Sequence, residues 1–476
     1  MFTKNDLRKL IIPLIIEQLL GISVGMFDTM MISSLGESAV SGVSLVDMLN
    51  VLMINIFAAL ATGGAVICAH EIGRIKGINK TENDQNNKAG DYADARFAAR
   101  QLLIVLLIAS TLIAVAAYIL RVQLLRLCFG SIEADVMDYA LTYFIISAVS
   151  YPFIAVYNGL AALFRTMGNS RITMIASLLL NIMNIIGNAL FIYVFNWGVA
   201  GAAWSSTISR VFGMVMLLVI IMNKRHVLYI DFRESFRPHL ATIKRILRIG
   251  VPGSLENSVF QLGRILVISM IAGFGTVQTA ANAVANTLDS LGCIPGQALG
   301  LAVITVVGQC IGAGDLVAAR KYEQKLLKYA YLFMAILNVT IIATLPLTFM
   351  LYKLSPETLE LAEILVILHN GFAMLFWPVS FVLPNALRAA QDVRFTMIVS
   401  IFSMIAFRVF FSWVIGVQFG TGIIGVWIAM IFDWIFRGAL FIWRIRSGRW
   451  LSKLPASIMQ RVQAEPEAIS SVNGGE

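Results

Sequence analysis

Charged residues are scarce in this chain of 476 residues. They make up 13% of it, whereas 58% of the residues are hydrophobic and the mean hydropathy is +0.81. A soluble domain of this size does not hide so much apolar surface, which excludes an ordinary soluble protein. The long apolar runs also lack the strict alternation of a transmembrane β-barrel. Because a backbone in lipid must satisfy its own hydrogen bonds, these runs predict membrane-spanning helices.

Cysteine is rare as well, and the four cysteines are scattered and form no CxxC pair. We therefore infer neither a disulfide framework nor a metal site from them. The chain has no P-loop, no HExxH motif, no catalytic-triad pattern and no loop that resembles a selectivity filter. These absences argue against an enzyme and against a channel, and we expect no cofactor.

Twelve apolar runs of about 20 residues or more are long enough to cross a membrane. They lie near residues 10–33, 43–69, 97–119, 138–163, 172–194, 198–222, 248–272, 281–311, 328–350, 361–386, 395–416 and 423–443. The first run is too long for a signal peptide, contains acidic residues and is not followed by a small-residue cleavage site. We therefore predict twelve membrane-spanning helices.

Lysine and arginine are almost absent from one side of this predicted topology. One set of loops, together with both ends of the chain, carries most of them, whereas the opposite set carries only Arg121, Arg126 and Lys353. The positive-inside rule then places both termini in the cytoplasm and the protein in the cytoplasmic (inner) membrane. Because the basic loops account for much of the net charge of +9, we expect no nucleic-acid partner.

The two halves of the sequence resemble each other. Aligning Pro13 with Pro252 also aligns Glu17 with Glu256, both at an offset of 239. Further along, "RTMGNSRITMIAS" matches "RAAQDVRFTMIVS" at an offset of 223. The change of offset implies about fifteen extra loop residues between the second and third helices of the first half. Six helices per copy is an even number, so both copies enter the membrane in the same direction.

These patterns predict an all-α integral membrane protein, with twelve transmembrane helices in two parallel six-helix repeats around a central cavity. The N-terminal lobe is expected over residues 1–222 and the C-terminal lobe over residues 248–446. A cytoplasmic loop at 223–247 would join them. The polar tail, residues 447–476, is expected to be cytoplasmic and disordered.

Polar residues that occur in only one repeat are the better functional candidates. Asp28 aligns with Val267, so the second repeat has no counterpart of this acid. The fifth helix carries three asparagines on one face, where the second repeat has apolar residues; these are Asn181, Asn184 and Asn188, opposite Met404, Phe407 and Phe411. At about 1.5 Å of rise per residue, Asp28, Asn184, Asn188 and Ser206 all reach the outer half of a bilayer core. We predict that these four residues form one pocket.

The chemistry of this pocket follows from the single carboxylate. Burial in a low dielectric disfavours the charged form of Asp28, so it can hold a proton, or lose the proton when a cation and amide oxygens take its place. Such a group can act as a two-state switch for ion coupling. The alternative is that the asparagines only hold helices together and that Asp28 pairs with an arginine.

Four further acids lie within predicted spans. Glu17 and Glu256 each follow a proline by four residues, and each either lines the cavity or accepts a hydrogen bond from backbone that the proline leaves free. Asp47 and Asp289 occupy the second helix of each repeat, and each either faces the cavity or bonds across helices. We retain all four as possible cavity acids.

Several other charged or titratable residues also lie inside predicted spans. Asp433 and Arg437 are one helical turn apart, and we expect them to satisfy each other. His369 is a lone histidine, for which packing and cavity lining are the two interpretations. Arg264 and Arg408 need acidic partners.

We expect these partners to come from the acids of the same repeat. Glu256 and Asp289 are the two candidates for pairing with Arg264 and Arg408.

The chain resembles the multidrug and toxic compound extrusion (MATE) family over nearly its whole length. The pieces that carry the resemblance are "GMFDTMMISSLG", "FRTMGNSRITM", "NIMNIIGNALFI", "GVAGAAWSSTIS" and "VVGQCIGAGD". The family implies a fold of twelve helices in two six-helix lobes. It also implies drug export coupled to an ion.

The resemblance implies roles for particular residues. Asp28 matches the acid of the first helix that forms a cation or proton site with the fifth and sixth helices in the family. The fifth helix of the family usually reads Asn-x3-Asp, but here it reads Asn184-x3-Asn188, so one carboxylate is missing. Ser206 falls on the usual threonine of the sixth helix. The missing acid weakens a possible Na⁺ site at Asp28 and favours proton coupling.

We therefore expect a secondary active multidrug exporter that releases lipophilic, cationic compounds in exchange for inward H⁺ or Na⁺. The 21 methionines and 29 phenylalanines suit such ligands. Its partners would be small molecules and membrane lipids, and it would act as a monomer. The alternative is a flippase for a lipid-linked oligosaccharide of the same superfamily. A major facilitator transporter is disfavoured, because its basic loop motif is not found after the second helix.

Overall fold

The computed structural model describes residues 2–81, 92–130, 133–234, 236–350, 352 and 354–463. Most of the predicted insertion after the second helix, Lys353, and the last part of the predicted tail lie outside these residues. The chain forms two compact units. One contains Thr3–Ile72 and Asp84–Ser254, and the other contains Gly73–Asn83 and Leu255–Glu476 with the first two residues.

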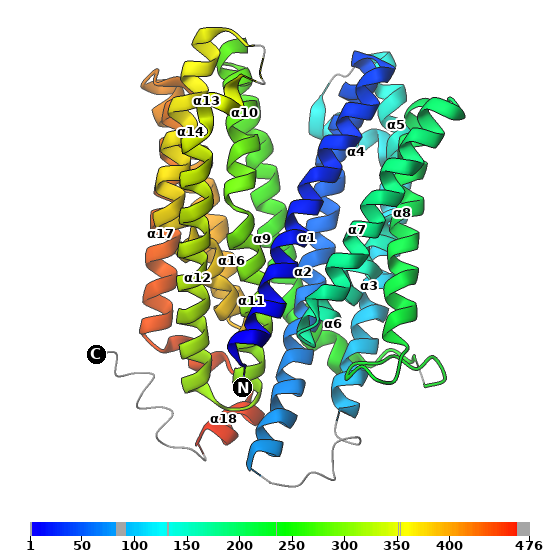
Figure 1. Cartoon of the computed structure of the whole chain (residues 1–476), viewed down its shortest axis with the longest axis vertical. Helices are drawn as coiled ribbons and strands as arrows, with labels where there is room; N and C mark the ends of the chain where they lie inside the picture. The colour runs from blue at the N-terminus through cyan, green and yellow to red at the C-terminus, as the bar shows by residue number, and fades with distance from the viewer. Residues whose placement is uncertain are drawn as a thin grey trace. The chain divides into compact units, whose positions relative to one another are not determined.

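The first unit is built from helices alone in its described residues (Figure 1). They are α1 Lys4–Ile32, η1 Ser33–Leu35, α2 Glu37–Thr81, α3 Ala93–Ile119, α4 Arg121–Phe129, α5 Ala134–Val149, α6 Tyr151–Thr166, α7 Ser170–Asn188, η2 Ala189–Val194, α8 Gly198–Ile221 and the start of α9 Leu240–Ala272. Two of these helices, α2 and α9, continue from this unit into the other.

The second unit is also helical throughout its described part. Its elements after α9 are α10 Thr276–Gly292, α11 Ile294–Gly312, α12 Leu316–Ala343, α13 Leu345–Phe349, α14 Pro356–Trp377, η3 Pro378–Val382, α15 Pro384–Ala389, α16 Val393–Ser403, η4 Met404–Phe411, η5 Trp413–Gln418, α17 Gly422–Arg446, η6 Arg449–Lys453 and α18 Ala456–Gln463. The two units therefore do not coincide with the predicted ranges 1–222 and 248–446.

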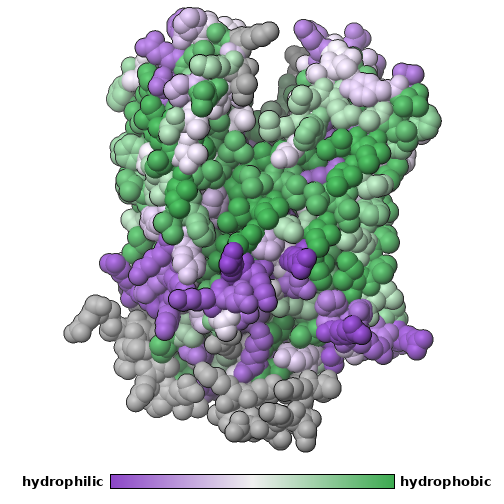
Figure 2. Space-filling model, viewed as in Figure 1, coloured by the Kyte–Doolittle hydropathy of each residue, from purple (hydrophilic) through white to green (hydrophobic). Residues whose placement is uncertain are grey.

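The helices have the lengths and surfaces of membrane spans. Eleven helices in the described chain are long and apolar enough to cross a membrane, and the bent pair α5–α6 brings the number to twelve. This agrees with the predicted all-α membrane fold. Large apolar side chains such as Leu112, Val219 and Ile398 are more than 60% exposed. Figure 2 shows hydrophobic residues along the middle of the helices of each unit and hydrophilic residues towards their ends, as lipid solvation requires.

The ends of the first helix of each repeat follow from local sequence. At the start of α1, Thr3 and Asp6 form a capping box, in which each side chain accepts a hydrogen bond from the other's backbone N–H. After the first helix of each repeat, Gly36 and Gly275 adopt φ values of 103° and 104°. This region of φ favours glycine, which explains why the repeat retains it at both turns.

Breaks in the helices could not be read from hydropathy. The predicted spans 138–163 and 281–311 are each broken, the first at Ser150 with a bend of 48° and the second at Cys293. Each break is followed two residues later by a proline, Pro152 or Pro295, which lacks the backbone donor of a continuous helix. The fifth helix of each repeat ends in π-helical turns, η2 in the first and η4 and η5 in the second. Such turns are frequent at functional sites.

The prediction of a disordered tail is wrong for its described part. Residues 449–463 form η6 and α18. Trp450 is buried and its Nε1 donates to the carbonyl of Ile445 at 3.3 Å. Arg461 donates to the carbonyl of Gly312 at 2.7 Å, at the end of α11. The buried indole of Trp450 stabilises this segment. The cation of Arg461 adds to this by binding the C-terminal end of α11.

Candidate functional site

The asparagine face of α7 lies inside the first unit. Asn181, Asn184 and Asn188 are 7%, 3% and 0% exposed. The helical spacing brings all three to one face, and α1 and α8 pack against α7. Asn181 donates to the carbonyl of Leu20 on α1 at 2.8 Å, so this residue links two helices. Asn184 and Asn188 have different partners.

The structure brings Asp28 to Asn188 and Ser206 to Asn184. Asn188 Nδ2 donates to Asp28 Oδ1 at 2.5 Å, and Asn184 Nδ2 donates to Ser206 Oγ at 3.1 Å. The four residues come from α1, α7 and α8 of the first unit. Within the residues that the structure describes, the amide oxygens of both asparagines have no hydrogen-bond partner although they are buried. A buried oxygen without a donor is costly, which makes these atoms candidate ligands for an ion.

A close approach of α7 and α8 holds this arrangement together. Ser205 Oγ donates to the carbonyl of Asn184 at 2.7 Å. A Cβ atom at Gly187 would lie 2.5 Å from the same hydroxyl oxygen. Glycine is therefore required between the two polar asparagines, because any larger residue would push the helices apart.

Replacing Gly187 with Ala is expected to destabilise the first unit by about 1–3 kcal/mol, the usual cost of overpacking a filled interior. Gly21→Ala in α1 is the matched control, because a Cβ there would meet nothing within 4 Å and alanine is the better helix former. Unfolding of both variants by sodium dodecyl sulfate, followed by circular dichroism, measures the difference. Equal stability of the two variants would contradict the close approach.

Sequence reasoning missed one charged neighbour of Asp28, the side chain of Arg210. Asp47, one of the possible cavity acids, accepts a hydrogen bond from Asn50 at 3.2 Å. Arg210 on α8 attracts both Asp28 and Asp47 electrostatically, but its Nη1 donates to Ser150 Oγ at 2.5 Å. The available signal was the lone arginine in the apolar sixth span. In the described chain no arginine lies within ion-pair distance of Asp28.

Glu17 and Glu256 both have arginine partners. Glu17 accepts from Arg165 at 3.1 Å and from Thr173 Oγ1 at 2.6 Å. In the second unit, Glu256 accepts from Arg388 at 2.8 Å. These are equivalent pairs in the two repeats, since Arg165 and Arg388 differ by the same offset of 223 as the surrounding motif. Both acids are therefore engaged in ion pairs within their own unit.

The expected pair of Asp433 and Arg437 is not made in the described structure. Asp433 accepts a hydrogen bond from the hydroxyl of Ser403 instead. The guanidinium of Arg437 lies 3.8 Å from Glu256 and 4.5 Å from the ring centre of Phe381. Residues one turn apart on one helix can meet, but here partners on neighbouring helices offer better geometry. The spacing alone could not distinguish these cases.

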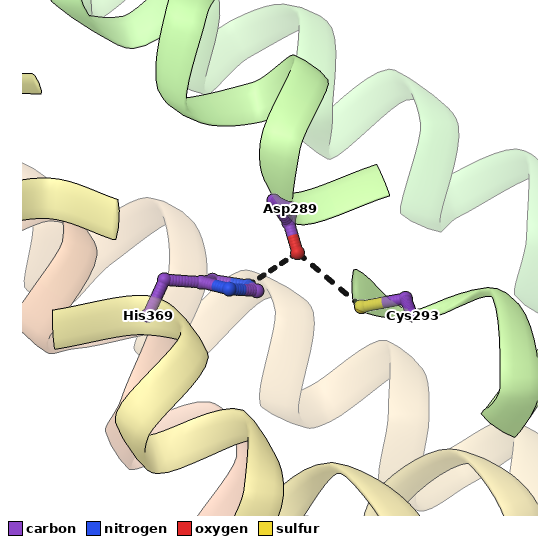
Figure 3. Close-up of side chains that lie close together, drawn as sticks. All are labelled: Asp289, Cys293 and His369. Atoms are coloured by element: carbon purple, nitrogen blue, oxygen red, sulfur yellow. Dashed lines mark hydrogen bonds and ion pairs between the residues drawn. The ribbon is translucent and has the colours of Figure 1, made fainter. Parts of the chain in front are cut away.

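His369 is not alone, because Asp289 and Cys293 lie beside it (Figure 3). The Nε2 of His369 on α14 lies 2.6 Å from Asp289 Oδ1 on α10, and Cys293 Sγ donates to the same oxygen at 3.3 Å. The three possible ligand atoms lie within 4.8 Å of one another. No pattern in the sequence predicted that these three residues would be neighbours. They are of metal-ligating types, but the hydrogen bonds to Asp289 already account for their grouping.

A family model and the related sequences indicate the same protein family. The MatE family model matches residues 13–77, 85–190 and 252–414, which is more than half of the chain. The uncharacterized transporter YisQ of Bacillus subtilis (strain 168) is 27% identical over 449 residues, covering 93% of this chain and 94% of YisQ. A probable multidrug resistance protein NorM of Thermotoga maritima is 24% identical over 458 residues, covering 94% and 93%.

Solved structures share the fold. A multidrug resistance MATE family transporter in an outward-facing conformation superposes with a TM-score of 0.82 at 20% identity, covering 94% of this chain and 96% of that one. A MATE transporter in a bent conformation gives a TM-score of 0.80 at 19% identity and covers 98% and 97%.

Proposed function

The chain belongs to the MatE family, whose members are multidrug efflux transporters and not enzymes, and we propose that it is a secondary active exporter. In this proposal, lipophilic compounds leave in exchange for inward H⁺ or Na⁺. The coupling ion is a transported substrate, and no resident cofactor is needed. The bacterial relatives place such a transporter in the cytoplasmic membrane.

The observation that supports ion coupling is the group of buried oxygen atoms on α1, α7 and α8 that includes the carboxylate of Asp28. This carboxylate, the unpartnered amide oxygens of Asn184 and Asn188, and the hydroxyl of Ser206 form a set of hard oxygen ligands. Hard cations prefer such ligands. A proton on the carboxyl is the alternative occupant, and then Asp28 can donate a hydrogen bond as well as accept one. Either occupant neutralises the carboxylate.

The exchange cycle follows from this neutralisation. In the outward-open state, Asp28 takes up H⁺ or Na⁺, the helices α1, α7 and α8 repack, and the drug is released. A ligand can bias two conformations only by its differential affinity for them. The π-helical turns of η2, directly after Asn188, give α7 a segment in which the hydrogen-bond pattern changes. Both termini remain cytoplasmic in this proposal, as the distribution of basic residues predicts.

The proposed cargo is lipophilic and cationic, because aromatic faces attract organic cations and methionine side chains adapt to varied ligands. We propose that the protein acts as a monomer in contact with membrane lipids.

Transport in proteoliposomes tests the coupling. The purified protein is reconstituted, a fluorescent lipophilic cation such as ethidium serves as cargo, and a proton gradient and a sodium gradient are imposed separately. The missing second carboxylate leads us to expect that the proton gradient drives export. Export driven by sodium alone would contradict proton coupling. If neither gradient drives export, the antiport proposal fails.

Replacing Asn188 with Asp restores the second acid of the Asn-x3-Asp pattern. Two carboxylates at the contact now made by Asn188 and Asp28 repel each other unless a proton or cation lies between them. We expect this variant to bind Na⁺ about tenfold more tightly than the wild type, corresponding to about 1.4 kcal/mol of added binding, so that a sodium gradient also drives its export. Asn188→Ala is the control, since it removes the amide without adding charge. An unchanged sodium dependence of Asn188→Asp would contradict the ligand set.

A further inference from the structure

The second unit contains a small pocket between α9, α10, η4 and α17. Its polar wall holds Arg264, Arg408, Asn282 and Asn286, and Trp427 and Met430 contribute to its apolar wall. The pocket is not part of the Asp28 site, which belongs to the first unit.

The pocket occupies the repeat position that holds the acid in the first unit. At the offset of 239, its wall residue Val267 replaces Asp28 and Arg264 replaces Gly25. At the offset of 223, Arg408 replaces Ile185, in the same segment where phenylalanines replace Asn184 and Asn188. The first repeat therefore carries an acid in this region, whereas the second repeat carries two arginines close to the equivalent positions.

Local packing brings the two arginines to one pocket. A Cβ atom at Gly263 would collide with Met404, so the glycine allows α9 to approach η4 closely. The guanidinium of Arg408 lies 5.5 Å from the ring centre of Phe260 on α9. Both arginine side chains line the space between these two elements.

Neither arginine has an acidic contact in the described structure. The expected pairing of Arg264 and Arg408 with Glu256 or Asp289 is not made. Asp289 is bonded to His369 and Cys293 (Figure 3), and Glu256 is paired with Arg388. Asp289 attracts both arginines electrostatically and Asp433 attracts Arg408, but neither acid lies within ion-pair distance of these arginines in the described residues.

The charges of Arg264 and Arg408 favour an anionic ligand in this pocket. An arginine in a membrane span keeps its charge and is expensive unless it faces water, protein acceptors or an anion. Arg264 is exposed on α9, a candidate span. A guanidinium group matches carboxylate and phosphate in a bidentate geometry. The indole of Trp427 is fixed by donating to Asn282 Oδ1 at 3.2 Å, and it forms a rigid, nearly buried part of the pocket wall.

We propose that this pocket binds the anionic group, a carboxylate or phosphate, of an amphiphile whose apolar body rests on the apolar wall of the pocket, where Ile268 is 38% exposed. That such an amphiphile is cargo rests on the proposed export function; that it binds here does not. The transporter would then accept compounds with an anionic group, which an acidic site alone would repel.

Binding of two matched aromatic probes tests the proposal. The full-length protein is placed in phosphatidylcholine nanodiscs, and 2-naphthoate and 2-naphthylmethylammonium are titrated by calorimetry against empty nanodiscs as blanks. These probes share one ring system and differ in charge. We expect the wild-type protein to bind the carboxylate more tightly. Equal binding, or preference for the ammonium, would overturn the proposal.

Arginine variants locate the site. Arg264→Gln and Arg408→Gln are each expected to weaken naphthoate binding about tenfold or more, since each removes a charge-assisted hydrogen bond. Arg264→Lys keeps the charge but loses the bidentate hydrogen-bonding geometry of the guanidinium group, so an intermediate affinity is expected. Arg394→Gln, an exposed arginine of the same unit outside the pocket, is the matched control. Wild-type affinity in both glutamine variants would overturn the assignment.

A second lipid composition distinguishes the source of the anion. If a lipid phosphate fills the pocket, nanodiscs with phosphatidylglycerol will compete with naphthoate, and Arg264→Gln will abolish the competition. If the pocket takes a soluble amphiphile, lipid composition will not change naphthoate affinity. Both results support the proposal that the pocket binds an anionic group. Failure of ion-driven ethidium export would contradict the proposed function, whereas these binding results are independent of it.

Discussion

Replacing Asp28 with Asn is expected to abolish ion-driven drug export while leaving the protein folded. The amide cannot carry a proton and does not balance the charge of a bound cation. Losing one charged ligand costs about 10- to 100-fold in ion affinity, which is the effect of removing a charge-assisted contact. The fold should survive, because the carbonyl oxygen of the new side chain can still accept the hydrogen bond that Asn188 now donates to Asp28.

The measurement is the initial rate of ethidium export from proteoliposomes under the gradient that drives the wild type. Asp138→Asn is the matched control, since Asp138 is an exposed acid of α5 in the same unit and the change removes the same charge. Export by the control should stay at the wild-type level. Undiminished export by Asp28→Asn would show that the ion binds elsewhere, and the group of buried oxygen atoms that includes the Asp28 carboxylate would then serve only to hold α1 against α7.

The number and type of the helices were predictable because lipid imposes a strong constraint on composition. A span of the required length and hydropathy has few alternatives to a helix. The ends of the helices were less predictable. The prediction ended the second span near residue 69, but α2 continues to Thr81, because a helix can extend beyond its apolar segment when polar neighbours such as Gln309 contact it. Lys76 donates to Gln309 at 2.8 Å.

The candidate site was predictable to the extent that one helix defines it. Helical periodicity alone placed Asn184 and Asn188 on one face, and the repeat comparison singled out Asp28. The hydrogen bonds that link these residues to Asp28 and Ser206 depend on how α1, α7 and α8 pack. No sequence pattern gives that packing. The unpartnered amide oxygens could be recognised only after the packing was known.

Pairings between distant residues were the least predictable feature. The repeat identified Glu17 with Glu256 and placed an arginine in each equivalent turn, but it did not show that each acid contacts that arginine. The grouping of Asp289 with His369 is similar, because 80 residues separate them. For Arg264 and Arg408, the predicted pairing is not made. The two candidate acids, Glu256 and Asp289, contact other residues instead.

Replacing Glu256 with Gln is expected to destabilise the second unit by about 3–5 kcal/mol, the cost of breaking a buried ion pair from one side. Glu256 is 4% exposed and lies 2.8 Å from Arg388 and 3.8 Å from Arg437. Glutamine fills the same space but leaves both guanidinium groups without a contacting carboxylate. Unfolding by sodium dodecyl sulfate, followed by circular dichroism, measures the loss.

Two comparisons separate charge from packing in this result. Glu17→Gln removes the equivalent acid of the first unit, where one arginine and Thr173 are the contacts, so a smaller loss is expected. The double change Glu256→Gln with Arg388→Gln removes an uncompensated cation and should recover part of the stability that the single change loses. A single variant as stable as the wild type would mean that water or another acceptor already compensates Arg388 and Arg437. The repeated glutamate–arginine pair would then not be a source of stability, and its presence in both repeats would need a role in transport to explain it.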